Sequence, residues 1–312
     1  MRSEELDYAL PPELIAQHPA DRRDASRLLV YDRATGAVRH RTFADLPSEL
    51  SGELVVVNDT KVVPARLNLQ RESGGAAEVL LLEPLGGGVW EALARPSRRL
   101  RSGERLGPVE LLEPLGEGRW RVHLDGEPDG EPPLPPYIHE PLAEPGRYQT
   151  VYAADPGSAA APTAGLHFTP ELLAQLDVER VTLHVGLDTF RPLAVAELEQ
   201  HELHGERYRV APEAWARIEA AERVLAVGTT TVRVLETIAR EGELDGRTSL
   251  YVLPGFTFQR VDALLTNFHL PRSTLLALVM AFAGVDAVRD LYRIAIDEQY
   301  RFYSFGDAML IL

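Results

Sequence analysis

The apolar and polar positions of the chain follow patterns that predict two different architectures. Residues 27–31, 38–43 and 54–57 form short runs typical of strands, and the continuous apolar run at 54–57 is typical of a strand buried at the centre of a sheet. Between residue 62 and about 124, short alternating runs are separated by glycine-rich turns, which predicts an antiparallel barrel or sandwich without a convincing helix. Seven prolines between residues 126 and 146 exclude a helix or central strand there.

After residue 148 helical and strand patterns alternate, as in an α/β layer. Thr169 is placed as the N-cap of a helix that starts with a proline, Ser273 as the N-cap of an apolar helix that runs to Gly284, and Asp286 as the N-cap of a helix that runs through Gln299. A further helix is expected at 230–240, and strands at 181–185, 224–227, 248–253 and 308–312.

These patterns predict an α/β fold in which a mixed sheet is flanked by helices and an antiparallel β-barrel domain is inserted. We expect residues 1–61 and 147–312 to form the α/β catalytic domain. Residues 62–146 should form the inserted barrel together with its proline-rich return to the first domain.

Composition limits the cellular compartment. Cysteine is absent, which excludes disulfides, thiolate metal sites and cysteine nucleophiles and fits a reducing compartment. The N-terminal residues lack the apolar segment of a secretory signal, and the longest apolar run, 275–283, is well short of the roughly 20 residues that a membrane-spanning helix needs. We therefore expect a cytoplasmic enzyme without a membrane partner. The sequence leaves the oligomeric state open, a monomer included.

Charge limits the partners. The net charge of −15 disfavours non-specific binding to nucleic acid, so an RNA partner requires a local basic patch. One run places five arginines within eleven residues: Arg95, Arg98, Arg99, Arg101 and Arg105. These side chains are dense enough to hold phosphate oxygens if they share a face. A solvated turn explains the run equally well, and the sequence leaves both interpretations open.

Four polar segments follow predicted strands, where α/β sheets usually bind ligands. They are residues 147–169, residues 184–192 with 201–206, residues 228–233, and residues 266–274 with 300–307. Each has a plainer interpretation when taken singly. His201 and His204 have a spacing seen in metal sites but no clear third ligand, and His184 fits a hydrogen-bonded core histidine. Residues 228–231 fit a simple helix start, and Phe302, Tyr303 and Phe305 fit core aromatics.

Twelve segments nevertheless match one family in order along almost the whole chain. They are DYALP (7–11), IAQHP (15–19), SRLL (26–29), VNDTKV (57–62), PARL (64–67), LPPYI (134–138), RYQTVYA (147–153), APTAGLHFT (161–169), TLHVG (182–186), AVGTT (226–230), LTNFHLP (265–271) and GDAML (306–310). In these segments the chain closely resembles the S-adenosylmethionine:tRNA ribosyltransferase-isomerases of queuosine biosynthesis.

The resemblance implies a reaction and a fold. The ribosyl portion of S-adenosylmethionine, the co-substrate, is transferred to the 7-aminomethyl group of a 7-deazaguanine base at the tRNA wobble position and isomerised to an epoxycyclopentanediol. Adenine and methionine leave, and the product is epoxyqueuosine in tRNA. The family fold is an α/β domain with an inserted β-barrel, and no metal is expected.

The chain departs from the family pattern at several positions. Asp188 stands where the pattern has glycine, which adds a Cβ and a charge beside an expected ligand loop. Leu203 replaces a methionine at similar volume, the stretch between Leu176 and Val181 is shortened, and residues 139–140 are His-Glu where a basic residue is common. Asp188 keeps open the alternative that the acceptor of the ribosyl group has changed.

The implied chemistry suggests candidate roles. A base must remove the acidic 5′ proton next to the sulfonium, and we assign this step to His204 with Glu206 as its orienting partner in one loop. His167 or His269 would assist adenine departure, and Asp307 or Glu236 would face the aminomethyl cation and the guanine-like edge. Further candidates for substrate binding are Thr229, Thr230 and Arg233 for the methionine carboxylate, Tyr303 or Phe305 for the sulfonium or a base, and Arg147, Tyr148, Gln149, Thr163, Gly165 and Asn267 in the matching loops.

Two alternatives belong to other classes of protein. The β-rich insertion is consistent with a non-catalytic RNA-binding module that the α/β domain merely supports, although the clustered histidines argue against it. A metal-dependent hydrolase built on His201 and His204 is the other alternative. Metal analysis of the purified protein tests the hydrolase alternative.

Overall fold

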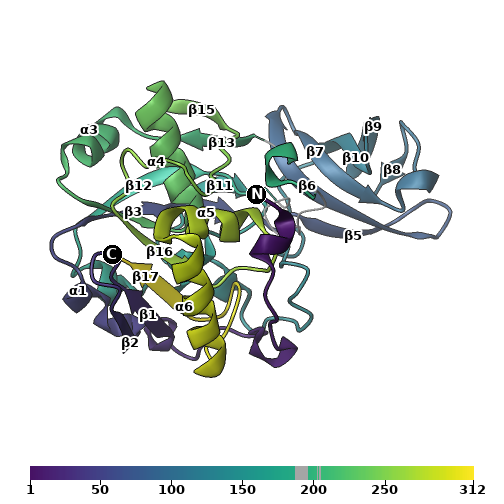
Figure 1. The fold of residues 1–312 in the computed structure, drawn as a ribbon. Coiled ribbons are helices and arrows are strands. Elements are labelled where there is room, and N and C mark those ends of the chain that lie inside the picture. The colour runs from purple at the N-terminus through teal and green to yellow at the C-terminus, as the bar shows by residue number, and fades with distance from the viewer. Residues whose placement is uncertain (187–195, 202, 204) are drawn as a thin grey trace.

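A nine-stranded mixed sheet forms the larger part of the molecule (Figure 1). The structure is a computed structural model that describes residues 1–186, 196–201, 203 and 205–312. Across the sheet the strands run in the order β15 (Asp245–Thr248), β13 (Glu206–Arg209), β12 (Val178–Leu183), β3 (Leu54–Asn58), β14 (Val224–Val227), β16 (Ala263–Asn267), β17 (Ala308–Ile311), β1 (Arg27–Tyr31) and β2 (Val38–Thr42). Strands β12, β3, β14 and β16 are mutually parallel, whereas β17 is antiparallel to β16.

Strand β3 lies at the centre of this sheet, as its apolar run predicts. It pairs in parallel with β12 and with β14, and all five of its residues are buried. Leu54 and Val56 face one hydrophobic core, while Val55 and Val57 face a second core on the other side. Both faces of the sheet are covered, which explains why apolar residues occur here without alternation.

Helices cover the sheet. The longer ones are α3 (Pro212–Ala220), α4 (Thr229–Glu241), α5 (Thr274–Ala283) and α6 (Val285–Asp297), and the single turns are α1 (Leu46–Glu49) and α2 (Pro170–Leu173). The predicted caps at Thr169 and Ser273 are present: their hydroxyls accept the backbone N–H groups of Leu172 and Leu276, both at 3.2 Å. None of the described helices is long and apolar enough to cross a membrane.

Two local predictions are wrong. Gly284, not Asp286, is the N-cap of α6, because its φ of 94° turns the chain from α5 directly into α6 and leaves Asp286 inside the first turn. The strand expected at 248–253 is instead β15, which ends at Thr248. The carbonyls of Thr248 and Leu250 accept hydrogen bonds from the Arg233 guanidinium, at 2.9 and 3.0 Å. A side chain therefore binds the backbone at the end of β15 and just beyond it.

Six antiparallel strands form a nearly closed barrel, which lies to one side of the large sheet in Figure 1. Their order is β5 (Arg66–Gln70), β6 (Ala76–Gly86), β7 (Val89–Arg95), β10 (Arg119–Leu124), β9 (Val109–Gly116) and β8 (Arg105–Leu106). The barrel has a hydrophobic core of its own that includes Val79, Leu111 and Val122. The predicted fold class is therefore confirmed.

Two short strands lie beside the connections to the barrel. β4 (Thr60–Val62) pairs in parallel with β11 (Asp155–Ser158), and the sequence patterns predict neither strand. We propose domain boundaries at residues 62 and 146, because all six barrel strands lie between residues 66 and 124 and both flanking parts contribute strands to the large sheet.

Candidate active site

A pocket opens where the carboxyl ends of β14 and β16 meet the first turn of α4. Ligands of α/β sheets ordinarily bind at this edge, because strand ends and helix N-termini leave backbone groups unpaired. The pocket encloses about 520 Å³ of empty space, part of it open to solvent. It is lined by Tyr137, Ala161, Pro162, Thr163, Ala164, Val185, Gly228, Thr229, Thr230, Thr266, Asn267, Phe268, His269, Leu270, Leu275, Tyr303 and Ser304.

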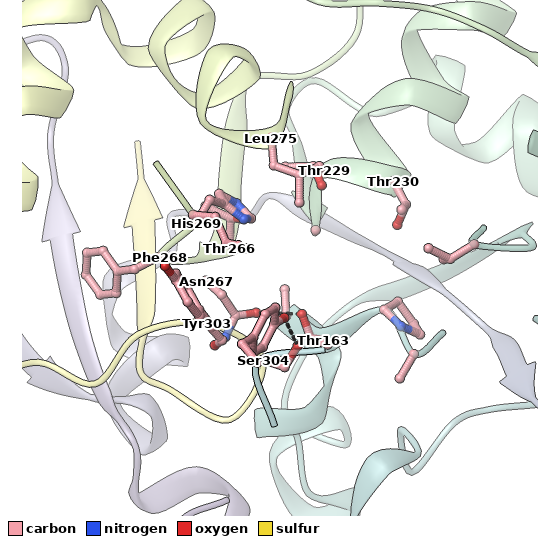
Figure 2. Close-up of a pocket in the computed structure, with 17 residues that line it drawn as sticks. Thr163, Thr229, Thr230, Thr266, Asn267, Phe268, His269, Leu275, Tyr303 and Ser304 are labelled. Carbon is pink, nitrogen blue, oxygen red and sulfur yellow. Dashed lines mark hydrogen bonds between the residues drawn. The ribbon is translucent and has the colours of Figure 1, made fainter. Parts of the chain in front are cut away.

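The start of α4 forms one wall. Gly228 has a φ of 85°, a conformation that favours glycine, and its N–H donates to the Leu265 carbonyl of β16 at 2.7 Å. Thr229 and Thr230 follow in the first turn, and Figure 2 shows them across the pocket from Thr163 and Ser304. The unpaired N–H groups and the two hydroxyls of this turn suit a carboxylate or another anion.

Asn267, at the end of β16, joins three loops. Its amide nitrogen donates to His167 Nε2 and to the Tyr303 carbonyl, both at 3.2 Å. Its amide oxygen accepts from Thr163 Oγ1 at 3.2 Å. One buried amide therefore sets the relative positions of the loops that follow β11, β16 and α6.

His269 is the histidine that lines the pocket. Its Nε2 shares a hydrogen bond of 2.7 Å with Thr266 Oγ1, whereas no described residue forms a hydrogen bond with its Nδ1. Burial lowers the pKa of His269 to about 3, because the imidazolium would lose its hydration. The ring is therefore neutral near pH 7, and Nδ1 is left to bond a ligand.

Two tyrosines form an aromatic wall. The rings of Tyr137 and Tyr303 lie 4.7 Å apart at 55°, and the Tyr137 hydroxyl bonds Ser304 Oγ at 2.7 Å. Burial raises the pKa of Tyr303 to about 12, so its hydroxyl stays protonated. Tyr303 also has a φ of 70°, a conformation that is costly for a side chain with a Cβ and that tends to occur at functional sites.

A family model described as "Queuosine biosynthesis protein" matches residues 3–311. The chain belongs to this family. A Rubrobacter xylanophilus protein named S-adenosylmethionine:tRNA ribosyltransferase-isomerase is 53% identical over 328 residues, which cover 100% of this chain and 98% of the relative. A Symbiobacterium thermophilum protein of the same name is 52% identical over 341 residues and is covered completely, as is this chain.

A solved structure gives the same result. The crystal structure of S-adenosylmethionine tRNA ribosyltransferase from Thermotoga maritima is 40% identical in sequence. The match covers 99% of this chain and 100% of that one, with a TM-score of 0.59. The resemblance inferred from the twelve segments is therefore confirmed at the level of the family.

The family segments converge on the pocket. Residues 161–164, 228–230 and 266–270, which belong to three of those segments, supply most of its lining. Thr163, Thr229, Thr230, Asn267 and Tyr303 were expected site residues, and the structure brings them together with His269. Tyr137 also lines the pocket and is not among the expected site residues, although it lies in the matching segment at 134–138.

His167 lies behind the pocket wall. The Asn267 amide donates to its Nε2, so Nδ1 carries the proton and bonds Ser26 Oγ at 2.7 Å. The ring stacks on Phe43, with centroids 4.9 Å apart. Burial lowers the pKa of His167 to about 4, against the opposing influence of Asp307. Both ring nitrogens are thus occupied by protein groups.

The two expected recognition carboxylates are buried and hold backbone. Asp307 accepts the backbone N–H groups of Arg27 and Arg301 at 3.0 and 2.8 Å, and it pairs with the Arg301 guanidinium at 3.1 Å. Glu236 accepts three consecutive backbone N–H groups, those of residues 259–261, at 2.8 to 3.1 Å. Neither residue lines the pocket.

Glu206 and Arg233 form a buried ion pair. Glu206 begins β13, so its expected position in a loop is wrong, and its Oε1 accepts the Gly186 N–H at 2.8 Å. Arg233 also donates to the Thr248 and Leu250 carbonyls. The pair therefore fixes the end of β12 beside α4, and the Arg233 guanidinium is fully engaged away from the pocket.

Arg147 and Gln149 bind backbone. Arg147 donates to the carbonyls of Ala20 and Asp21, the latter at 3.1 Å. The Gln149 amide makes two hydrogen bonds with the backbone of Val62, at 3.0 and 3.1 Å. These side chains attach residues 147–149 to neighbouring segments.

Three other expected residues are packed into the interior. A Cβ on Gly165 would lie 1.9 Å from the Tyr152 hydroxyl, so only glycine fits there. Tyr148 and Phe305 are buried and meet edge to face, with centroids 5.9 Å apart. None of these residues lines the pocket.

The arginine run lies at the surface of the barrel. The side chains of Arg95, Arg98, Arg99 and Arg101 are exposed and make no hydrogen bond or ion pair with any other described residue. Arg105 differs, because it pairs with Asp125, and about half of each side chain is exposed.

Several histidine predictions depend on residues 187–195, 202 and 204. Asp188 and His204 lie outside the described residues, so the expected base and the glycine replacement remain predictions.

His201 is described and meets the Tyr251 ring edge to face, with centroids 5.7 Å apart. Within the described part of the chain, no group of three histidine, aspartate or glutamate side chains is arranged to hold a metal ion. His184 bonds Thr60 Oγ1 at 2.8 Å, in agreement with a hydrogen-bonded structural histidine.

Proposed function

We propose that this chain transfers and isomerises the ribosyl group of S-adenosylmethionine onto tRNA in queuosine biosynthesis. The acceptor is the 7-aminomethyl-7-deazaguanine base at the wobble position, and the products are epoxyqueuosine-tRNA, adenine and methionine. The observation that carries the proposal is the full-length family match whose segments surround one pocket. We place the reaction in the cytoplasm, with tRNA and S-adenosylmethionine as the partners.

The start of α4 suits the methionine carboxylate. Thr229 and Thr230 line the pocket in the first turn of α4, where N–H groups lack intrahelical partners and the helix dipole favours an anion. The Thr230 hydroxyl accepts from the Asn58 amide at 3.3 Å and keeps its own proton to donate. Arg233, the other candidate, is engaged with Glu206 and two carbonyls. We therefore assign the carboxylate to the two threonines.

His269 suits the departing adenine better than His167 does. Adenine accepts electron density as its glycosidic bond breaks, and a hydrogen bond to a ring nitrogen stabilises that charge. His269 lines the pocket with Nδ1 unoccupied, whereas both nitrogens of His167 are bonded. With a pKa of about 3, His269 is neutral and carries one ring proton; it donates through Nδ1 in the tautomer in which Nε2 accepts the Thr266 hydroxyl.

The aromatic wall suits a planar or cationic group. Tyr137 and Tyr303 present ring faces and edges to the same pocket, and either can contact the sulfonium or stack on a base. The wobble base lies in an anticodon loop, where it is already poorly stacked and can turn into a pocket at modest cost.

The base that removes the 5′ proton is assigned to His204, with Glu206 near it in the sequence. Replacing His204 by alanine should lower the single-turnover rate while leaving tRNA affinity nearly unchanged. An unchanged rate would remove His204 from the chemistry.

The proposal is tested by adenine release from S-adenosylmethionine in chelator-treated buffer. We expect release with tRNA that carries the aminomethyl-deazaguanine base and none with the same tRNA carrying guanine. Calorimetric binding of S-adenosylmethionine serves as the control for an intact site. If the folded protein binds S-adenosylmethionine but releases no adenine with the modified tRNA, the acceptor has changed and the proposal fails.

A further inference from the structure

Two tyrosines from distant parts of the chain grip the main chain of His269. The Tyr8 hydroxyl donates to the His269 carbonyl, and the His269 N–H donates to the Tyr292 hydroxyl at 2.9 Å. Tyr8 lies near the N-terminus and Tyr292 lies on α6. The N–H and the carbonyl of His269 are thus both bonded to phenol oxygens, and not to backbone groups of a neighbouring strand or helix.

The same N-terminal segment also holds the turn that follows His269. Arg272 has a φ of 52°, which is unfavourable for a residue with a Cβ. Its N–H donates to the Leu6 carbonyl at 3.1 Å, and its guanidinium pairs with Asp7. The three consecutive residues 6–8 therefore compensate a strained turn that begins at the pocket.

The two phenols contact each other and neighbouring aromatic rings, and both also line a second cavity beside α6. Tyr8 and Tyr292 meet edge to face with centroids 5.1 Å apart, and Tyr292 packs edge to face on Phe268 at 5.5 Å. Burial raises the pKa of each hydroxyl, so both stay protonated and Tyr8 remains a donor. A clamp of this kind fixes a backbone position more tightly than a loop alone can.

We infer that Tyr8 and Tyr292 are positioning residues that hold His269 where its imidazole meets the departing adenine. The inference rests on the proposed function and on the role of His269 within it. Neither tyrosine lines the pocket, so each acts through His269. A displacement of the imidazole by about 1 Å suffices to cost about 100-fold in rate.

Tyr8→Phe and Tyr292→Phe test this role, because each removes only a hydroxyl. We expect the kcat of adenine release to fall about 10- to 100-fold with little change in the KM for S-adenosylmethionine. Tyr208→Phe is the matched control: the Tyr208 hydroxyl also donates to a backbone carbonyl, that of Glu243 at 2.9 Å, but it lies on β13, next to the edge strand β15. It should lose comparable stability without losing turnover.

A double-mutant cycle separates positioning from simple stabilisation. In a His269→Ala background, Tyr8→Phe should lower turnover no further, because the group that it positions is gone. Equal losses with and without His269, or turnover within about twofold of wild type in both single tyrosine variants, would overturn the inference.

A readout without turnover keeps this test apart from the proposed function. In protein labelled with ¹⁵N-histidine, the ring resonances of His269 should shift in Tyr8→Phe and Tyr292→Phe and stay unchanged in Tyr208→Phe. If wild type releases no adenine, the proposed function fails, and the resonances alone decide whether the two tyrosines position His269. If wild type is active and the His269 resonances do not move, the clamp fails and the function stands.

Discussion

Five arginines of the α/β part and four arginines of the run on the barrel differ in what their side chains bind. In the α/β part, the guanidiniums of Arg23, Arg33, Arg147, Arg233 and Arg260 donate to backbone carbonyls of distant segments. On the barrel, the side chains of Arg95, Arg98, Arg99 and Arg101 bond no other described residue. These five arginines of the α/β part are therefore bound into the fold, and the four of the run are available to a phosphate.

This difference decides what an arginine near a site can do. Bonds to two carbonyls hold a guanidinium in place, so it must give them up to move to a ligand elsewhere, and the broken bonds leave buried groups unpaired. Arg147 and Arg233 lie in or beside segments that match the family, yet their partners are protein groups. We therefore expect their replacement to affect stability first and binding second.

The largest expected effect is that of Arg233→Met. The substitution removes the Arg233 guanidinium from the buried Glu206 carboxylate and from the Thr248 and Leu250 carbonyls. We expect a loss of about 3–5 kcal/mol in the free energy of unfolding, measured by urea denaturation. Arg101→Met on the barrel is the control and should change stability by less than about 0.5 kcal/mol. Similar losses in both variants would remove the distinction between the two regions.

The next effect concerns pH. The pKa of His167 is lowered to about 4 and that of His269 to about 3, whereas both histidines titrate near 6.5 in the unfolded chain. The unfolded state therefore binds more protons below pH 6.5, so stability is fully present above that pH and is lost as the pH falls toward 4. Each histidine should cost roughly 2 kcal/mol by pH 5.

A flattened pH dependence in His167→Gln would identify that contribution. Urea denaturation between pH 8 and pH 5 should show, below pH 6.5, a slope lowered by about 1.4 kcal/mol per pH unit relative to wild type. An unchanged slope in His167→Gln would mean that the ring is protonated in the folded protein.

The sheet and the barrel are predictable from the sequence because buried positions are apolar and their spacing follows the period of the strand or helix. The apolar run of β3 placed it at the centre of the sheet, and the short alternating strands between residues 66 and 124 indicated the barrel. Strand β13 has no apolar pattern that predicts it, because three of its four residues, Glu206-Arg-Tyr-Arg209, are charged and only one is aromatic. Charged residues of this kind suit a strand near the edge of a sheet.

The partners of polar side chains could not be predicted from the sequence. His167 and His269 both lie in family segments, and only the fold shows that Ser26 and Asn267 take both nitrogens of His167. Glu236 likewise gives no local sign that it holds residues 259–261. Such bonds join residues more than 20 positions apart, so no local pattern records them.

A third prediction tests the exposed arginines. The triple variant Arg95→Gln, Arg98→Gln and Arg101→Gln should weaken tRNA binding about tenfold at physiological salt if the run binds phosphates. The slope of log affinity against log salt should fall by about 0.7–0.9 for each phosphate that the variant no longer neutralises. Filter binding across a salt series measures both quantities, and S-adenosylmethionine binding should be unaffected. An unchanged slope with unchanged affinity would leave the run as a solvated turn.

The smallest effect, that of Arg105→Gln, sharpens the comparison within the run itself. Arg105 pairs with Asp125 at the surface, and such exposed pairs contribute only about 0–1 kcal/mol to stability. Because the Asp125 carboxylate competes for the guanidinium, Arg105 should add less to the salt slope than an unpaired neighbour does. Filter binding of Arg105→Gln beside Arg101→Gln makes the measurement. Equal reductions of the slope would mean that the pair opens when tRNA binds, and an existing surface ion pair would then be no guide to which arginines meet phosphate.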